Sequence, residues 1–212
     1  MSRVDGSVIV ALVLAGGQSR RMGFDKALML RNGEPLLQRT CRVAMGCASR
    51  VYVVTPWGER YRSILPARIE VWPESAAADP DGRRPGPLVA LAEVTSVLAT
   101  GATPPTWVLV LACDLPYLNA RALQTWVSGL ATLPPSVMAY LPRHRDRWEP
   151  LCGFYRATCG ASWQTYLKTG ERSFQGWLNQ QSVVAIPDVN PLWLANVNTP
   201  DDLAQWDILG PM

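Results

Sequence analysis

The fold is decided by an apolar stretch near the start of the chain, Val8-Ile-Val-Ala-Leu-Val-Leu14, which is followed closely by Gly16-Gly17. A continuous apolar run without polar alternation is typical of a strand that is buried on both faces of a parallel sheet. In such sheets, ligands bind at the carboxyl ends of the strands. The sequence therefore predicts an α/β fold with a functional site beside the two glycines.

Strands and helices alternate along the rest of the chain. A second strongly apolar strand is expected at 106–112. Weaker strands are expected at 50–54, 69–72, 136–140, 151–155 and 182–186, and helices at 35–48, 88–100, 119–130, 157–167 and after 200. This alternation predicts a mostly parallel, Rossmann-like sheet with helices on both faces. Because 212 residues leave little room for a second unit, we expect a single domain over 1–212.

Composition excludes several classes of protein. With 48% apolar and 17% charged residues, the chain can build a large core, which excludes a disordered or fibrous protein. The longest apolar run, Val8 to Ala15, is far shorter than the ~20 residues that cross a bilayer as a helix. The N-terminus lacks the features of a signal peptide, so we expect a cytoplasmic protein without a membrane partner. A net charge of only +3, with scattered arginines, argues against binding to nucleic acid.

The cysteines and the histidine argue against three further kinds of site. The chain has 5 cysteines, an odd number, and no Cys-x-x-Cys, so neither a disulfide framework nor a zinc site is expected. A single histidine, His144, argues against a His-based triad.

The first chemical motif is the turn after the first strand, from Leu14 to Lys26. Glycines there let backbone N–H groups approach an anion closely, and Arg20, Arg21 and Lys26 add positive charge. A bound triphosphate needs both features. The spacing matches neither a P-loop nor the Gly-x-Gly-x-x-Gly of nicotinamide-binding folds, which disfavours both. The alternative is a simple strand-to-helix turn with solvated arginines.

The second motif is Cys113-Asp-Leu-Pro-Tyr117, which follows the second apolar strand. Mg²⁺ is bound in proteins by one or two carboxylates together with substrate phosphate oxygens and water. Asp114 therefore suits a metal anchor, or else it caps the turn or the next helix. Its place at the same sheet edge as a cationic glycine turn favours the metal hypothesis.

The segment from Leu14 to Lys26 resembles the signature Leu-Ala-Gly-Gly-x-Ser-x-Arg-Met-Gly-x-Asp-Lys of the molybdenum cofactor guanylyltransferases, a family of sugar-type nucleotidyltransferases. Three later segments resemble family motifs in the same order: Pro85–Leu88, Cys113–Tyr117 and Asn196–Pro200. The resemblance covers nearly the whole chain. It implies an Mg²⁺-dependent transfer of GMP from GTP to the phosphate of molybdenum-molybdopterin, which gives molybdopterin guanine dinucleotide and pyrophosphate.

The resemblance also implies roles for individual residues. Catalytic roles fall to Arg21, Lys26 and Asp114, and the metal to Asp114. The expected GTP contacts are Leu14, Ala15, Gly16, Gly17, Lys26, Thr55, Glu74 and Asp114, and the acceptor contacts are Asn196 and Asn198. Thr55 contacts the base or simply ends its strand. The expected partners are GTP and the molybdopterin cofactor, with the chaperones that insert the cofactor into molybdoenzymes as further candidates.

The chain departs from the family pattern at three places. Glu74 stands where the family has an Asp that contributes to guanine recognition, Ala90 replaces a Gly, and the loop over 75–87 is expanded at 79–84. Two alternatives therefore stay open: a related nucleotidyltransferase that uses CTP or another acceptor, and a non-catalytic protein that binds a nucleotide or the cofactor.

Overall fold

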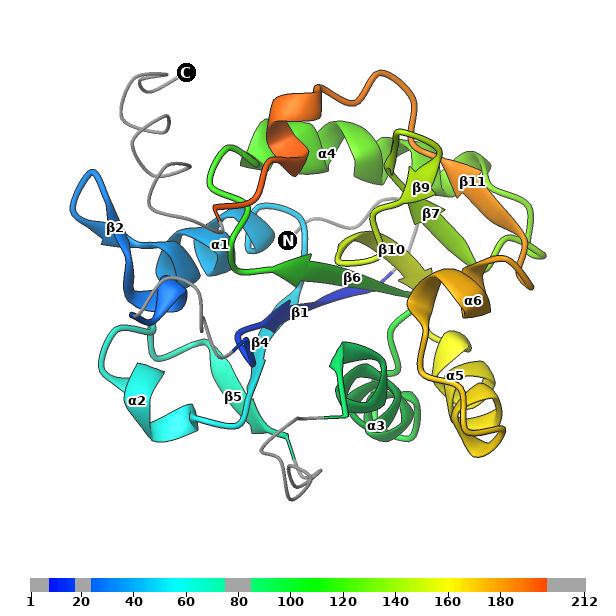
Figure 1. Cartoon of the computed structure of the whole chain (residues 1–212), viewed down its shortest axis with the longest axis horizontal. Helices are drawn as coiled ribbons and strands as arrows, with labels where there is room; N and C mark the ends of the chain where they lie inside the picture. The colour runs from blue at the N-terminus through cyan, green and yellow to red at the C-terminus, as the bar shows by residue number, and fades with distance from the viewer. Residues whose placement is uncertain (1–7, 18–23, 75–84, 198–212) are drawn as a thin grey trace.

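The computed structural model describes residues 8–17, 24–74 and 85–197. Its centre is a seven-stranded sheet in the order β11-β7-β10-β6-β1-β4-β5 (Figure 1). The strands are β1 Ile9–Leu14, β4 Arg50–Thr55, β5 Glu70–Pro73, β6 Trp107–Ala112, β7 Ala139–Leu141, β10 Cys152–Arg156 and β11 Val183–Ala185. All neighbours are parallel except β10, which runs antiparallel to β6 and β7. The predicted fold class, a mostly parallel α/β sheet, is confirmed.

Helices cover both faces of the sheet because both faces of β1 are apolar. Ile9, Ala11 and Val13 point to one face, where α1 (Leu36–Ala44) and α4 (Ala120–Gly129) pack. Val10, Leu12 and Leu14 point to the other face, which is covered by α3 (Pro87–Ala99), α5 (Cys159–Lys168) and α6 (Phe174–Leu178). In Figure 1, α4 lies above the sheet, and α3 and α5 lie below it. Asn119 caps α4, since its side chain accepts a hydrogen bond from the backbone N–H of Ala122.

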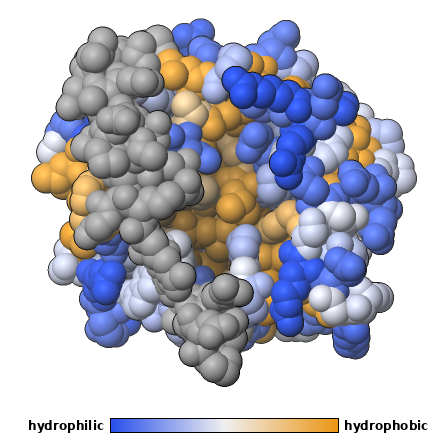
Figure 2. Space-filling model, viewed as in Figure 1, coloured by the Kyte–Doolittle hydropathy of each residue, from blue (hydrophilic) through white to orange (hydrophobic). Residues whose placement is uncertain are grey.

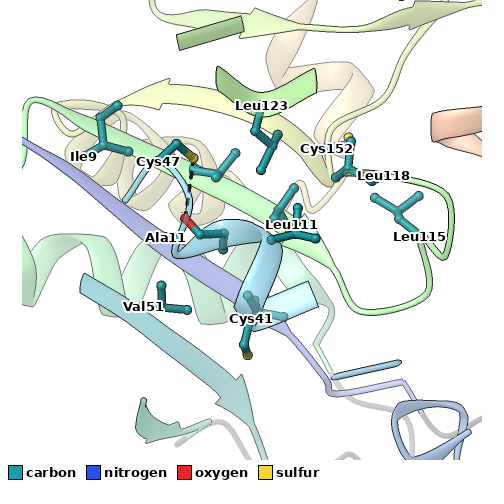
Figure 3. Packing of buried hydrophobic residues seen from close by; sticks show 14 of the residues in the cluster. Ile9, Ala11, Cys41, Cys47, Val51, Leu111, Leu115, Leu118, Leu123 and Cys152 are labelled. Carbon is teal, nitrogen blue, oxygen red and sulfur yellow. Dashed lines mark hydrogen bonds between the residues drawn. The ribbon is translucent and has the colours of Figure 1, made fainter. Parts of the chain in front are cut away.

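Figure 3 shows the core on the face of α1 and α4. Ile9 and Ala11 of β1 and Leu111 of β6 lie with Cys41 of α1 and Leu123 of α4, and none of the five is more than 1% exposed. Burying a side chain the size of leucine contributes ~1.5–3 kcal/mol to stability. All five cysteines are free thiols, which confirms the expectation of no disulfide. Burial raises the pKa of Cys41 and Cys47 to about 12, so both thiols are inert at neutral pH.

Several short elements were not predicted, because three to five residues carry too little periodicity. They are the helical turns η1 Lys26–Leu28, η2 Leu130–Thr132 and η3 Pro191–Leu194, the helices α2 Gly58–Arg62 and α6, and the pairs β2 Leu30–Arg31 with β3 Glu34–Pro35 and β8 Arg143–His144 with β9 Arg147–Trp148. The first pair turns at Asn32-Gly33, where both residues have positive φ (50° and 79°), as a two-residue hairpin requires.

One expected helix is shorter in the structure, and two other expected segments lie wholly or mostly outside the described residues. The helix predicted at 35–48 ends at Ala44. The helix expected after 200 and most of the loop at 75–87 lie outside the described residues. Among the helices that the structure describes, none has the length and apolar character needed to span a bilayer.

Candidate active site

A cavity of about 420 Å³ opens at the carboxyl ends of β1 and β6. The two strands are paired in parallel with Leu14 opposite Ala112, and the backbone N–H of Cys113 donates to the carbonyl of Leu14 at 3.2 Å. The turns that follow the two apolar strands therefore meet at one edge of the sheet. The volume lies within the ~300–1,000 Å³ of typical ligand pockets.

Four runs of three or four consecutive residues, together with several single positions and the pair Gly86-Pro87, form the wall of this cavity. The lining residues are Leu14–Gly17, Asp25–Ala27, Tyr61, Glu74, Gly86, Pro87, Ala112–Leu115, Glu149–Cys152, Leu194 and Asn196. The face seen in Figure 2 is hollowed near its centre, where hydrophobic atoms form the floor and polar residues surround it. A wall of this kind suits a ligand with both a flat apolar part and charged groups.

The glycine turn is hydrogen-bonded to the end of β4, and the side chain of Glu74 lies close to it. The backbone N–H of Ala15 donates to the carbonyl of Val54 at 3.0 Å, and the hydroxyl of Thr55 donates to the carbonyl of Ala15 at 2.9 Å. A Cβ on Gly16 would overlap the carboxylate of Glu74, whereas a Cβ on Gly17 would meet no atom within 4 Å. Glycine at position 16 therefore lets the Glu74 carboxylate lie against the turn, and Gly17 leaves the backbone open to a ligand.

Lys26 and Asp114 connect the two turns across the cavity. The ammonium Nζ of Lys26 lies 3.7 Å from Oδ2 of Asp114, and their side chains are only 14% and 21% exposed. Burial raises the pKa of the Asp114 carboxyl, and the neighbouring Lys26 ammonium partly opposes this rise. The pair thus places a positive and a negative charge at a poorly hydrated point of the cavity wall. Because water screens them little there, both interact strongly with a charged ligand.

Asp25 fixes the position of Lys26 through three hydrogen bonds. Its carboxylate accepts from the backbone N–H of Ala27 at 3.0 Å, from the hydroxyl of Tyr61 at 2.8 Å and from Nη1 of Arg60 at 2.9 Å. The first bond caps η1, which carries Lys26, and the other two tie η1 to α2. Tyr61 is fully buried, and burial followed by the Asp25 charge raises its pKa. No sequence pattern pointed to Tyr61, because its helix is only five residues long.

The opposite wall comes from the C-terminal half of the chain. Asn196 lines the cavity, and the backbone N–H of the next residue, Val197, donates to the carbonyl of Asp114 at 3.3 Å. Glu149 also lines it, as a half-buried carboxylate whose pKa is raised by burial, against the lowering effects of His144 and Arg147.

The structure brings together most of the predicted site residues. Those that line one cavity are Leu14, Ala15, Gly16, Gly17, Lys26, Glu74, Asp114 and Asn196. Thr55 does not line it: its side chain is fully buried beneath the turn and supports Ala15. Arg21 and Asn198 lie outside the described residues, so their roles stay predictions.

The donor set fits a magnesium ion that arrives with a phosphate ligand. Among residues 8–17, 24–74 and 85–197, no cluster of three or more His, Cys, Asp or Glu side chains could hold a metal. The carboxylates of Asp114 and Glu74 nevertheless line the same cavity. One or two carboxylates suffice for Mg²⁺ when phosphate oxygens and water complete its six ligands.

Residues 11–184 match the family model of the MobA-like NTP transferase domain. The chain belongs to this family. It is 44% identical over 207 residues to a protein of Trichormus variabilis, with 96% of this chain and 94% of that protein covered. It is 42% identical over 192 residues to a protein of Synechococcus elongatus, with 91% and 94% covered. Each of these relatives is named a probable molybdenum cofactor guanylyltransferase.

Solved structures at low sequence identity share the fold. Molybdopterin-guanine dinucleotide biosynthesis protein A from Archaeoglobus fulgidus superposes with a TM-score of 0.71 at 20% identity, covering 94% of this chain and 97% of that one. A 4-diphosphocytidyl-2C-methyl-D-erythritol synthase from Anaerococcus prevotii gives 0.67 at 12% identity, covering 97% and 96%. Because the second neighbour's name indicates cytidylyl chemistry, the fold alone does not select the nucleotide.

Proposed function

We propose that this nucleotidyltransferase transfers GMP from GTP to the terminal phosphate of molybdenum-molybdopterin with the help of Mg²⁺. The observation that carries the proposal is the single cavity in which the glycine turn, Lys26 and Asp114 meet. The choice of the molybdenum cofactor as acceptor and of GTP as nucleotide is supported by the names of relatives at 42–44% identity.

The glycine turn and Lys26 bind the triphosphate. Backbone N–H groups at Gly16 and Gly17 donate to phosphate oxygens, and the open space beside Gly17 allows the close approach. Lys26 adds one positive charge at the same place, where low exposure limits screening by solvent.

Glu74 selects the base. Its carboxylate lies against Gly16 at the edge of the cavity. A carboxylate accepts two hydrogen bonds side by side, and guanine offers two adjacent donors, N1–H and the 2-amino group. Cytosine offers a single amino group at its Watson–Crick edge, so this side chain favours GTP over CTP.

Asp114 would hold the metal ion, which would neutralise charge on the phosphates as a Lewis acid. The acceptor phosphate is itself the nucleophile: its oxygen forms a bond to the α-phosphorus while the bond from this phosphorus to the bridging oxygen breaks and pyrophosphate leaves. The acceptor is already an anion at neutral pH, so no side chain needs to remove a proton. The protein contributes alignment and positive charge, and Lys26 stabilises the charge that develops on pyrophosphate.

Asn196 and Glu149 line the wall on which the acceptor would lie. The hydrogen bond between Val197 and Asp114 keeps this wall at a fixed distance from the metal anchor. The in-line attack needs both substrates in one geometry, and a rigid connection of the two walls provides it.

The test is to incubate the protein with Mg²⁺, molybdenum-loaded molybdopterin and each nucleoside triphosphate in turn, and to identify the pterin product by mass. We expect a guanine dinucleotide and pyrophosphate with GTP alone. A cytosine dinucleotide with CTP would replace this proposal with the cytidylyl alternative. Tight binding of Mg·GTP without pyrophosphate under any acceptor condition would support a non-catalytic protein.

A further inference from the structure

A second cavity, of about 230 Å³, lies apart from the proposed active site. It is formed by the β2–β3 hairpin, helix α1 and the start of α4, and Figure 1 shows the hairpin beside α1. Its lining residues are Arg31, Asn32, Glu34, Arg39, Arg42, Tyr117 and Asn119, none of which lines the first cavity. Every lining side chain is charged, amide-bearing or aromatic, so the cavity suits a polar ligand.

Positive charge dominates this cavity. Three of its lining residues are arginines and one is a carboxylate, which leaves a net charge of +2. The carboxylate of Glu34 accepts from Nε and Nη2 of Arg42 at 2.9 and 2.8 Å. Among the described residues that line the cavity, Glu34 is the only carboxylate. Arg39 is half-buried, and its pKa is lowered by burial and then by repulsion from Arg31 and Arg42. A bound anion would relieve this repulsion.

The guanidinium groups are already held in place. Arg39 donates from Nε to the carbonyl of Pro116 at 3.0 Å and from Nη2 to the carbonyl of Leu118 at 3.1 Å. Arg31 donates from Nη1 to the same Pro116 carbonyl and lies over the ring of Tyr117, 5.0 Å from its centre. A guanidinium carries five N–H donors, so two bonds to carbonyls fix Arg39 and still leave donors for a ligand. Because the side chains are ordered before binding, little entropy is lost on binding.

We propose that this cavity is a binding site for a small phosphate-bearing anion, inorganic phosphate or diphosphate. Arginine is suited to phosphate, because its planar fork donates two parallel hydrogen bonds to the oxygens. The volume is below the ~300–1,000 Å³ of pockets for larger ligands, which favours a compact anion over a nucleotide. The inference concerns binding alone and does not depend on the transfer of GMP.

The test is a titration of the whole protein with inorganic phosphate, and separately with pyrophosphate, at constant ionic strength set by chloride. Backbone amide resonances of Asn32, Tyr117 and Asn119 report on this cavity, and those of Gly16 and Gly17 report on the first. We expect saturable shifts at the first group of amides. The anion that binds with the lower Kd shows whether the cavity accommodates one or two phosphoryl groups. Absence of a saturable shift there would overturn the proposal.

Two variants provide a matched pair. Arg42→Gln and Glu34→Gln break the same ion pair, so they disturb the local structure alike, but they change the charge of the cavity in opposite directions. We expect Arg42→Gln to weaken phosphate binding about threefold and Glu34→Gln to strengthen it about threefold at low salt. If the affinity for phosphate changed in the same direction in both variants, or changed in neither, the proposal would be overturned.

Discussion

The ammonium of Lys26 lies 3.7 Å from the carboxylate of Asp114, although 88 positions separate the two residues in the sequence. The parallel pairing of β1 with β6 brings them together, since it places the turns after both strands at one sheet edge. Both side chains are mostly buried, and the glycine turn lies in the same cavity wall. This arrangement is what a metal-bound triphosphate requires: a carboxylate for the metal and positive charge for the phosphates.

Replacement of Asp114 by Asn should lower kcat by about a hundredfold to a thousandfold, because the metal loses its anchor and with it several kcal/mol of charge stabilisation. Release of pyrophosphate from Mg·GTP in the presence of the acceptor measures the effect. Asp146→Asn is the control, since that side chain is 97% exposed on the β8–β9 hairpin, and it should leave kcat unchanged. Equal rates for Asp114→Asn and the wild type would refute the role of Asp114.

The same variant should stabilise the fold at neutral pH. The raised pKa of Asp114 means that its ionised form is less favourable in the folded than in the unfolded chain. Asn removes this penalty at pH 7, so the variant should melt at a higher temperature than the wild type. The difference should shrink as the pH falls below the raised pKa of the folded protein and should vanish below the ordinary carboxyl value of 3.8, where the wild-type residue is neutral in both states. A lower melting temperature at pH 7 would contradict the cause given for the shift.

The acidic limb of the pH profile should depend on Lys26. Metal binding needs an ionised Asp114, so kcat/KM should fall toward acid with a midpoint above 3.8. The Lys26 ammonium lowers the pKa of this carboxyl, and its removal in Lys26→Met should move the midpoint upward in addition to lowering the rate. A profile from pH 4 to 8 for both proteins provides the comparison. A midpoint that stays the same or moves downward would show that the two groups do not interact in solution.

Gly16→Ala should displace the Glu74 carboxylate and destabilise the protein by less than about 1 kcal/mol, because the new Cβ overlaps the end of a flexible side chain that can rotate away. The cost should largely disappear in the Glu74→Ala background, where the carboxylate is absent. Denaturant unfolding of the two single variants and the double variant gives the interaction energy. Gly17→Ala, which meets nothing within 4 Å, is the control for the loss of a glycine. Additive effects of the two substitutions would show that their contact is not the reason for Gly16.

Tyr61→Phe should lower kcat several-fold and stability by ~1.5–3 kcal/mol, the usual contribution of a hydrogen bond to a charged group. The lost hydroxyl is one of three donors to Asp25, which fixes the helical turn of Lys26. Steady-state kinetics and urea unfolding measure both effects. Arg62→Gln serves as the control, because it removes only an exposed ion pair with Glu59 on the same helix. If both variants behaved alike, Tyr61 would have no special role in positioning Lys26.

The sheet and the centre of the site could be predicted because each follows from a local pattern. The long apolar runs that became β1 and β6 identified the central strands. The rule that parallel strands present their carboxyl ends at one edge then placed Asp114 beside the glycine turn. Glu74 was placed at the site by the resemblance to the family, and it comes directly after β5.

The remaining parts depend on contacts that no local pattern encodes. Thr55 had two interpretations, a contact with the base or the end of its strand. Its hydroxyl is turned inward to the carbonyl of Ala15, and only the packing of β4 against β1 decides this direction. Tyr61 reaches Asp25 from a helix too short to be recognised. The arginine cavity joins α1 to a turn about 80 positions away, and scattered arginines looked like ordinary surface charge.

Calorimetric titration of GTP, with and without Mg²⁺, tests most directly whether Asp114 and Lys26 hold one metal-bound triphosphate. In the wild type, Mg²⁺ should tighten GTP binding at least ~10-fold, or about 1.4 kcal/mol, and this gain should vanish in Asp114→Asn. Lys26→Met should weaken GTP binding whether or not Mg²⁺ is present. A gain from Mg²⁺ that is just as large in Asp114→Asn would contradict the account.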